Sequence, residues 1–443
     1  MDENLKGKKI SAISLGCDKN RVDLEKMLFR LKEYGFQIVD DVEDANIVIV
    51  NTCAFITPAK NEALENIFEV CLLKEKGRVE KVVVTGCLPE RYKAELENEI
   101  KEVDAFVELK DNEKICQIIE NLYKSPHSAV KAKNGRVFTS RGSYAYLKIA
   151  DGCSNGCSFC TIPRIRGRYK SVPMEELVEE AKYLASQNVK ELILVAQDVS
   201  RYGEDIYKGN KLISLLDKLS RIKGISWIRL HYIYPEKTTD ELLSYISKND
   251  KVCAYVDIPL QHIDDEILKS MNRRLGEEAT RALVKNIRCN FKNIHIRSTF
   301  IVGYPLENGR KFKKLCAFLK ESRFDYAGFF PYYKEENTAS YYIPRQNREW
   351  TKKSRLKKVQ KLQAGIAYEN AKAHLSNVYK TLIDYFDDST GFFVGHTEFL
   401  SPTVDFGVKI VDNGKIKVGD FVDVKFLTFD GADYQGEVYE SSK

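Results

Sequence analysis

Short apolar runs alternate with helical patterns through most of the chain, and this alternation limits the folds open to it. Between residues 144 and 335, helical patterns separate the apolar runs, and Pro173 suits the first turn of one such helix. The candidate strands are Tyr146–Ala150, Leu192–Ala196, Trp227–Leu230, Tyr255–Pro259, Ile296–Val302 and Asp325–Phe330. Six strands, each followed by a helix or a connector, predict an incomplete form of the eight-stranded α/β barrel.

Residues 1–124 show the same alternation on a smaller scale. Candidate strands at Ile10–Leu15, Ile47–Val50 and Val82–Val84 are separated by helical stretches at Arg21–Tyr34 and Asn61–Lys74. Strands that alternate with helices favour a parallel sheet with helices on both faces. The sequence therefore predicts an N-terminal, doubly wound α/β domain.

The rest of the chain has a different character. Residues 125–143 lack a strong periodicity and are predicted to be a linker, and residues 336–378 form a connector that contains a long basic helix over 349–378. Residues 379–443 are short strand-like segments broken by turns at 388–391, 412–414 and 430–431. This pattern predicts a small antiparallel β-barrel. The predicted domains are thus 1–124, 144–335 and 379–443.

Composition narrows the class of protein. Of 443 residues, 43% are hydrophobic and 30% are charged, which excludes wholesale disorder and a fibrous fold. No apolar run approaches the roughly 18 residues of a membrane span, and the N-terminal MDENLKGKK lacks the apolar core of a secretory signal. We therefore expect a cytoplasmic protein without a membrane partner. In a reducing compartment its 11 cysteines point to metal or redox chemistry rather than to disulfides.

The net charge of +6 conceals an uneven distribution. Residues 379–443 hold six Lys, no Arg and twelve Asp or Glu, a balance of −6, which leaves +12 on residues 1–378. An acidic domain repels a nucleic-acid backbone and attracts a basic protein. The charge pattern therefore favours a basic protein as the substrate.

The strongest chemical signal is the C-x3-C-x2-C run of Cys153, Cys157 and Cys160, directly after the first strand of the predicted barrel. Three thiolates on one short loop can bind three irons of a [4Fe–4S] cluster and leave the fourth iron open. Gly152 and Gly156 allow the loop to bend. The alternatives are zinc, whose structural sites are closed by four ligands, and a chance grouping.

Three further cysteines repeat one placement. Cys17, Cys53 and Cys87 each lie just past the carboxyl end of a predicted parallel strand in the N-terminal domain. The carboxyl ends of neighbouring parallel strands meet at one crevice, so these residues could together hold a second cluster. The alternative is three buried thiols. For the other five cysteines, Cys71, Cys116, Cys253, Cys289 and Cys316, we expect core packing.

The C-x3-C-x2-C run, with Phe159 before its third cysteine, resembles the radical S-adenosylmethionine superfamily. This resemblance implies that the open iron binds the amino and carboxylate groups of S-adenosylmethionine, and that an electron from the cluster cleaves this cofactor to a 5′-deoxyadenosyl radical. The protein then has to bind, orient and shield the radical.

Together, the two sets of cysteines resemble the radical methylthiotransferase family, which has an N-terminal cluster domain, a radical barrel and a C-terminal TRAM domain. Within it, CTIPRIRG at 160–167, VAQDVSRYG at 195–203 and DIPLQH at 257–262 resemble the RimO type, which methylthiolates the β-carbon of an aspartate in small-subunit ribosomal protein S-twelve. The resemblance implies two [4Fe–4S] clusters, one of which carries the transferred sulfur. It also implies that S-adenosylmethionine is both methyl donor and radical source.

The chain departs from the family pattern at two places. Asp18 stands where the family usually has proline, and Leu306 replaces a turn glycine in Gly303-Tyr-Pro-Leu306-Glu307. We expect the second turn to be rebuilt with Gly309. The second departure affects the contacts made by that loop and leaves the cluster unaffected.

Residues at the predicted strand ends are candidates for cofactor or substrate contacts, because the carboxyl rim of an α/β barrel carries its chemistry. Gln197 and Asp198 end the second strand, Gln261 and His262 end the fourth, and Arg297 lies on the fifth. The alternative for Gln197 and Asp198 is a polar cap of the strand. The sequence assigns no catalytic acid or base.

Three functions stay open. The first is the RimO-type modification of a ribosomal protein, with a flavodoxin or ferredoxin as electron donor. The second is a MiaB-type modification of transfer RNA, whose enzymes typically read LGQNVN where this chain reads VAQDVS. The third is an iron–sulfur or zinc protein without catalytic activity.

Overall fold

The chain folds into two compact units. The computed structural model describes residues 5, 7–125, 135–139, 142–412 and 414–440. The N-terminal unit comprises Met1–Thr139, Asp151–Ser154 and Cys160–Tyr169, and the C-terminal unit comprises Ser140–Ala150, Asn155–Phe159 and Lys170–Lys443. The middle of the chain thus contributes to both units.

A five-stranded sheet forms the centre of the N-terminal unit. Its strands are arranged in the order β2-β1-β3-β4-β5, and every neighbouring pair is parallel. The strands are β1 (Lys9–Ser14), β2 (Gln37–Ile38), β3 (Ile47–Thr52), β4 (Lys81–Gly86) and β5 (Ala105–Val107). All six residues of β3 are buried, as expected for a central strand covered on both faces.

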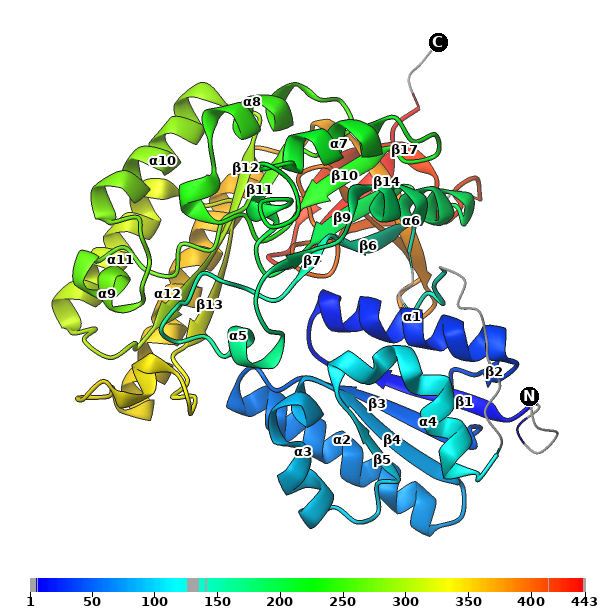
Figure 1. Ribbon diagram of the computed structural model, residues 1–443. Helices are drawn as coiled ribbons and strands as arrows, with labels where there is room; N and C mark the ends of the chain where they lie inside the picture. The colour runs from blue at the N-terminus through cyan, green and yellow to red at the C-terminus, as the bar shows by residue number, and fades with distance from the viewer. Residues whose placement is uncertain (1–4, 6, 126–134, 140–141, 413, 441–443) are drawn as a thin grey trace. The chain divides into compact units, whose positions relative to one another are not determined.

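Helices cover both faces of this sheet (Figure 1). Leu24 of α1 and Ile119 of α4 pack with Ile49 on one face, whereas Ile67 of α2 packs with Val50 on the other. The helices are α1 (Asp18–Tyr34), α2 (Thr57–Glu75), α3 (Cys87–Glu99), the 3-10 helix η1 (Leu109–Lys114), α4 (Ile115–Leu122) and α5 (Ile162–Ile165). The predicted doubly wound domain is confirmed.

Six parallel strands of the C-terminal unit form the predicted incomplete barrel. They are β6 (Tyr144–Lys148), β9 (Glu191–Val195), β10 (Trp227–Leu230), β11 (Tyr255–Asp257), β12 (His295–Val302) and β13 (Tyr326–Pro331). They make two three-stranded sheets, joined by a parallel bridge between Ile228 and Val252. Within the described part of the chain, β6 and β13 are not paired, so the barrel stays open on that side.

Helices connect these strands, as the alternating pattern predicted. Side-chain caps fix two of them: Thr239 accepts a hydrogen bond from the backbone N–H of Leu242, and Asn308 accepts one from Lys311. The elements are β7 (Ala150–Asp151), β8 (Lys170–Ser171), α6 (Met174–Ser186), η2 (Val199–Arg201), α7 (Leu212–Ser220), η3 (Pro235–Lys237), α8 (Asp240–Lys248), α9 (Asp265–Ser270), α10 (Glu277–Asn290), α11 (Gly309–Ser322), η4 (Ala339–Tyr342) and α12 (Glu349–Lys372). The long basic helix is therefore present, and it ends at Lys372.

The C-terminal segment closes into a small barrel with the strand order β14-β15-β16-β18-β17. Its strands are β14 (Val378–Asp387), β15 (Phe392–Thr397), β16 (Val408–Val411), β17 (Phe421–Phe429) and β18 (Tyr434–Val438). The small barrel is confirmed, with one parallel pair, β16 with β18, among otherwise antiparallel neighbours. We call it the small barrel.

The small barrel packs against the amino ends of the parallel strands. Trp227, Tyr255 and Tyr326, each the first residue of its strand, share a buried apolar cluster with side chains of the small barrel. Arg229 on β10 donates hydrogen bonds to the carbonyl oxygens of Glu398 and Thr397, at 2.7 and 3.1 Å. This end of the parallel barrel is therefore covered, and its carboxyl rim is left for chemistry.

Part of the predicted linker packs on the N-terminal unit. Its residues 126–134 and 140–141 lie outside the described residues. Arg136 forms a fully buried ion pair with Glu25 of α1, and the backbone N–H of Thr139 donates to the same carboxylate at 3.0 Å. Residues 135–139 thus have a fixed place on the first unit.

The turn after β12 differs from the prediction. Gly309 is the first residue of α11, and Leu306 itself adopts the left-handed backbone conformation, with a φ of 74°. That conformation costs a residue with a Cβ roughly 1–2 kcal/mol. The expectation that Gly309 rebuilds the turn is therefore wrong, because the neighbouring contacts of Glu307 with Gly303 and Arg355 hold the strained residue in place.

No helix in the described part of the chain combines the length and apolarity that a membrane crossing needs.

Candidate functional site

Cys17, Cys53 and Cys87 stand at the carboxyl ends of three adjacent parallel strands. Cys17 is the residue before α1, Cys53 directly follows β3, and Cys87 is the first residue of α3 after β4. A Cβ added to Gly16 would lie only 2.6 Å from the Cβ of Cys53, so the loop of Cys17 runs directly against Cys53. The structure therefore brings these three predicted ligands to one edge of the sheet.

Hydrogen bonds tie the three cysteine loops together. The side-chain amide of Asn20 donates to the carbonyl oxygens of Leu15 and Thr52, at 2.9 and 3.0 Å. The hydroxyl of Thr52 donates to the carbonyl oxygen of Thr85 at 2.6 Å and accepts from the backbone N–H of Leu88 at 3.3 Å. These bonds fix the backbone on both sides of the cysteines, as a preorganised ligand set requires.

Burial dominates the electrostatics of these thiols. It raises the pKa of Cys53, and it raises the pKa of Cys87 to about 12. The guanidinium of Arg166 opposes this effect by lowering the pKa of both thiols. Cys17 acts on both as a like-charged neighbour, which is a second indication that the three sulfur atoms lie close together.

The backbone around Cys153 needs its glycine. A Cβ on Gly152, whose φ is 71°, would lie 2.3 Å from the carbonyl oxygen of Arg168. The backbone N–H of Cys153 donates to the carbonyl oxygen of Gly167 at 3.1 Å. Cys153 and Cys160 belong to the N-terminal unit, and Cys157 belongs to the C-terminal unit.

Cys157 lies among polar groups that the sequence did not reveal. Its Sγ is 3.0 Å from the hydroxyl oxygen of Tyr234 and 3.6 Å from a guanidinium nitrogen of Arg273. Arg273 stacks over the Tyr234 ring, 4.0 Å from its centroid. Burial raises the pKa of Tyr234, so its phenol stays protonated and can donate to a thiolate. Tyr234 and Arg273 follow β10 and α9 in loops without a recognisable pattern.

Single-ion sites and cluster sites place different demands on the two sets of cysteines. Among the described residues, no three His, Cys, Asp or Glu side chains are arranged to hold a single metal ion. In an iron–sulfur cluster each thiolate binds a different iron, so the ligand sulfurs stand farther apart than around one ion. An all-thiol donor set beside a buried guanidinium suits an anionic cluster. The assignment of the six ligands is developed below as a proposal.

The other predicted site residues of the parallel barrel occupy different environments. Asp198 is buried after β9, where it accepts a hydrogen bond from the side-chain amide of Asn155 at 2.8 Å, and burial raises its pKa. Gln197 beside it is half-buried. Gln261 has a φ of 71° and pairs through its backbone with Thr299 and Ile301.

Phe159 packs in an apolar cluster, whereas Arg297 lies at the contact between the two barrels. Phe159 packs on a small cluster formed by Ile267, Met271, Tyr304 and Tyr332. Arg297 lies near the amino end of β12, where its guanidinium is bound by the carboxylate of Asp405 and by a backbone carbonyl of the small barrel. Arg297 thus joins the two barrels, away from the carboxyl rim.

Comparison with known proteins agrees with this fold. Residues 147–319 match the radical SAM superfamily, and residues 9–108 match a family described as uncharacterized protein family UPF0004. A radical S-adenosylmethionine methyltransferase, TsrM, from Kitasatospora setae has a similar fold, with a TM-score of 0.55 over 73% of this chain and 72% of that chain at 14% identity. The match over residues 147–319 identifies a radical SAM domain.

Full-length relatives narrow this class. Proteins named ribosomal protein uS12 methylthiotransferase RimO are 42% identical in Acetivibrio thermocellus, over 98% of this chain and 100% of the relative, and 41% identical in Aquifex aeolicus, over 98% of both. One from a Thermoanaerobacter species is 43% identical over 94% of this chain and 96% of the relative. The chain belongs to the RimO family.

Proposed function

We propose that the protein attaches a methylthio group to the β-carbon of an aspartate in ribosomal protein uS12, the S-twelve protein of the small subunit. The main support is the convergence of Cys17, Cys53 and Cys87 at the ends of three adjacent strands, in a chain that also carries C-x3-C-x2-C after β6. Two [4Fe–4S] clusters, one on each set of three cysteines, are therefore part of the proposal. A ribosomal substrate makes the enzyme cytoplasmic.

A cluster on Cys153, Cys157 and Cys160 would supply the electron that converts S-adenosylmethionine into a radical source. The chain's own groups have simpler tasks. Tyr234 and Arg273 hold Cys157 in place by hydrogen bonding to its sulfur. Asp198, fixed by Asn155, is a polar group at the carboxyl rim of the barrel, and with Phe159, Gln197 and Gln261 it is proposed to contact the cofactor. Arg297 is committed to the small barrel, which makes it the weakest of the predicted contacts.

The charge of the small barrel supports a basic protein substrate through its long-range field. Two of its carboxylates, Asp384 and Asp405, are used in buried pairs with His396 and Arg297, and the others contribute to the negative balance of residues 379–443. Since the small barrel covers the amino ends of the parallel strands, its charge would steer the substrate rather than hold the reacting aspartate.

Iron analysis of matched variants tests the two clusters. After anaerobic reconstitution we expect about eight irons in the unaltered chain, and about four each in Cys53→Ala and in the triple variant Cys153→Ala, Cys157→Ala, Cys160→Ala. Cys71→Ala, which removes a buried thiol on α2, is the control and keeps both clusters. A Cys53→Ala variant with eight irons and full activity would refute the auxiliary site.

Product analysis tests the substrate. Mass spectrometry of uS12 peptides from a deletion strain should show loss of the methylthio group, while transfer RNA keeps its own. Loss of the methylthio group from transfer RNA alone would establish the MiaB-type alternative.

Formation of 5′-deoxyadenosine by the reduced, reconstituted protein, with a flavodoxin or a ferredoxin as the proposed electron donor, separates both enzymes from a binding protein. A preparation with both clusters that makes none is not a radical enzyme.

A further inference from the structure

Arg166 carries a buried charge beside the three cysteines of the N-terminal unit. Its side chain is only 1% exposed and forms ion pairs of 2.9 Å with Asp23 of α1 and with Asp151. A guanidinium is costly to bury, so two carboxylates in one pocket mark a built site rather than a chance contact.

The same guanidinium is connected to the backbone of the cysteine loops. It donates a hydrogen bond of 3.1 Å to the side-chain oxygen of Asn20. The amide nitrogen of Asn20 in turn holds the carbonyl oxygens of Leu15 and Thr52, which lie two residues before Cys17 and one residue before Cys53. Arg166 therefore orients the side chain that joins two of the three loops.

Arg166 also acts on the sulfur atoms through its charge. Burial is the largest effect on the pKa of Cys53 and Cys87 and raises both values, whereas the positive charge of Arg166 lowers both. A cation close to a thiolate-bound cluster stabilises the state with one more electron, because that state is more negative. The effect is strong where water is excluded.

We propose that Arg166 is a positioning residue that raises the reduction potential of the cluster held by Cys17, Cys53 and Cys87. This inference rests on the proposed function, since it requires that cluster. The step is the uptake of one electron, with no bond made or broken. The positive charge of Arg166 raises the reduction potential of this cluster, and the negative charge of its partner Asp23 lowers it.

Redox titration followed by electron paramagnetic resonance tests the proposal. The background is the triple variant Cys153→Ala, Cys157→Ala, Cys160→Ala, so only the second cluster contributes a signal. Arg166→Gln should shift the midpoint potential downward, and Asp23→Asn should shift it upward. Arg166→Lys keeps the charge but not the planar set of hydrogen bonds, so its potential should lie closer to the background value than that of Arg166→Gln. Iron content and the spectrum of the oxidised cluster are measured for each variant.

The outcomes separate this proposal from the proposed function. A background protein without iron would overturn the auxiliary cluster and this proposal with it. A background that keeps four irons, with potentials that do not move or that move the same way in Arg166→Gln and Asp23→Asn, overturns the role of Arg166 alone. If Arg166→Gln loses its iron, the Asp23→Asn variant decides the question. The proposal is refuted if the midpoint potential of Asp23→Asn is not higher than that of the background protein.

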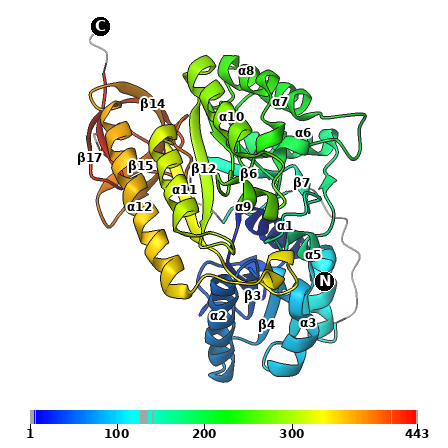
Figure 2. The same ribbon diagram turned by 90° about the vertical axis from the view of Figure 1, so that its left-hand side faces the viewer.

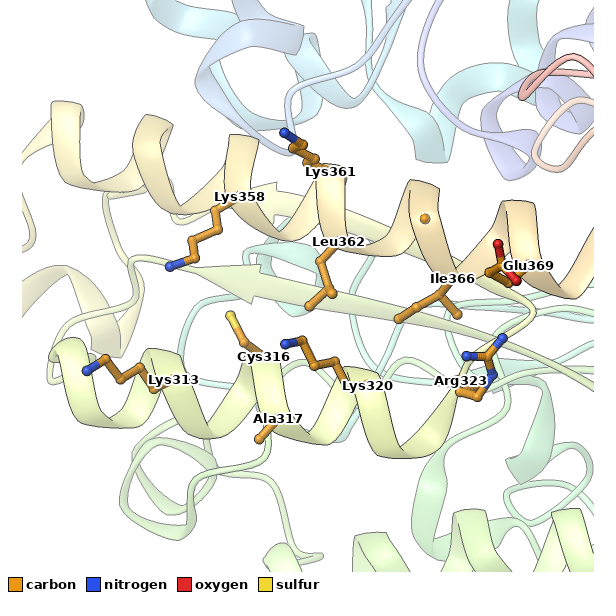
Figure 3. A pocket seen from close by; sticks show the side chains of 11 residues that line it. Lys313, Cys316, Ala317, Lys320, Arg323, Lys358, Lys361, Leu362, Ile366 and Glu369 are labelled. Atoms are coloured by element: carbon orange, nitrogen blue, oxygen red, sulfur yellow. The ribbon is translucent and has the colours of Figure 1, made fainter.

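A second inference comes from a groove between α11 and α12, which lie side by side (Figure 2). The groove has a volume of about 720 Å³, and Leu362 and Ile366 form part of its apolar lining. Figure 3 shows Lys313 and Lys320 on one wall and Lys358 and Lys361 on the other. This groove lies entirely within the C-terminal unit and is independent of the cysteines.

Among the described residues the four groove lysines form no ion pair, and Glu369, the one carboxylate in the lining given for the groove, is paired with Lys372 at 3.3 Å. No carboxylate lies within ion-pair distance of any of them there, whereas Lys311 and Lys314 on the same helix are paired with Glu266 and Asp264, at 2.6 and 3.0 Å. Unpaired lysines that line one groove repel one another, although Lys361 points away from α11 in Figure 3. The groove therefore favours a polyanionic ligand.

The composition of the groove distinguishes between two kinds of polyanion. Protein interfaces are enriched in aromatic residues, Met and Arg, and depleted in Lys. The groove has four lysines, one arginine and no aromatic or Met among its lining residues. Lysine, a compact point charge, suits phosphates. We infer that the groove binds the phosphate backbone of RNA, which a substrate inside a ribosomal subunit would supply.

Binding of a fluorescent RNA duplex of 16 base pairs tests this inference. The groove variant has Lys313, Lys320, Lys358 and Lys361 changed to alanine. The control variant has four other exposed lysines changed, which are Lys182, Lys218, Lys223 and Lys248. At about 100 mM salt we expect the groove variant to bind at least tenfold more weakly and with a shallower salt dependence, and the control within twofold of the unaltered protein.

A groove variant with unchanged RNA affinity overturns this inference and leaves an acidic protein as the alternative occupant. Equal losses in both variants also overturn it, because they would show that only overall charge matters. Circular dichroism spectra of both variants should match that of the unaltered protein, which controls for their folding.

Discussion

His396 tests how the small barrel is attached to the parallel barrel. Its Nδ1 lies 2.7 Å from a carboxylate oxygen of Asp384, and its Nε2 is paired with Glu191 on β9. Glu191 is also bound by Arg229 at 2.7 Å, and none of these side chains is more than 6% exposed. The pairs join strands that lie far apart in the sequence, so their charges stabilise the contact between the two barrels.

The pKa of His396 gives the expected magnitude. Burial lowers it, but Asp384 and Glu191 outweigh burial and raise it from 6.5 to about 9. Because the folded state holds its proton more tightly than the unfolded chain, the stabilisation is complete below pH 6.5 and is lost as the pH rises through 9. A difference of this size is worth about 3 kcal/mol.

The perturbation is His396→Gln, which keeps a hydrogen-bonding side chain of similar volume and removes the charge. We expect this variant to lose about 3 kcal/mol of unfolding free energy at pH 6 and to approach the unaltered protein near pH 9.5. Urea unfolding can be followed by the fluorescence of Trp227, whose ring centroid is 5.7 Å from that of His396, in a Trp350→Phe background that removes the other tryptophan.

His374→Gln is the matched control. Burial lowers the pKa of His374 to about 4, so in the folded protein this residue is neutral from pH 6 to pH 9.5, while the unfolded chain begins to take up a proton near pH 6.5. The His374→Gln variant should therefore gain stability relative to the unaltered protein as the pH falls to 6, the opposite sign to His396→Gln. The reasoning is refuted if His396→Gln shows an equal deficit at pH 6 and pH 9.5.

Three further predictions follow from single positions. Leu306→Gly removes a left-handed backbone strain of about 1–2 kcal/mol at a cost of roughly 1 kcal/mol in chain entropy. It should therefore raise the unfolding free energy by up to about 1 kcal/mol, whereas Leu306→Ala should not. Equal effects of the two substitutions would contradict the presence of strain at this position. Gly86→Ala places a Cβ 2.3 Å from the carbonyl oxygen of Thr52, and a thermal melt should show a loss of more than about 2 kcal/mol. Core packing, expected for both Cys253 and Cys289, is confirmed for Cys253 and wrong for Cys289, which is exposed near the end of α10. In the folded protein iodoacetamide should therefore modify Cys289 long before Cys253, as peptide mapping can check; the reverse order would contradict their placement.

The strands could be predicted from sequence because parallel strands buried on both faces are continuous apolar runs. Trp227–Leu230 matches β10 residue for residue, and Ile296–Val302 misses only the first residue of β12. The two-residue strand β2 carries no such signal, and it was missed. The placement of Cys17, Cys53 and Cys87 followed from the same rule, since the chain leaves every parallel strand at the same edge.

The partners of the site could not be predicted, because they depend on contacts between distant segments. Tyr234 lies 77 residues from Cys157 in sequence, and Asp405 lies 108 residues from Arg297. The strain at Leu306 could not be predicted for a different reason. The sequence shows that Leu306 replaces a glycine of the family motif. It does not show whether the backbone there keeps the left-handed conformation that a glycine adopts easily.

The order of synthesis gives the position of Arg166 a further meaning. The N-terminal unit is interrupted in sequence: it needs Cys160–Tyr169, thirty residues after Thr139. At about 5–20 residues per second, a nascent chain has all three early cysteines some 4–16 s before the guanidinium that pairs with Asp23 is made. A fragment that ends at Thr139 would keep the thiols and lack their cation. The first unit to be translated is thus finished only after the chain has begun the second.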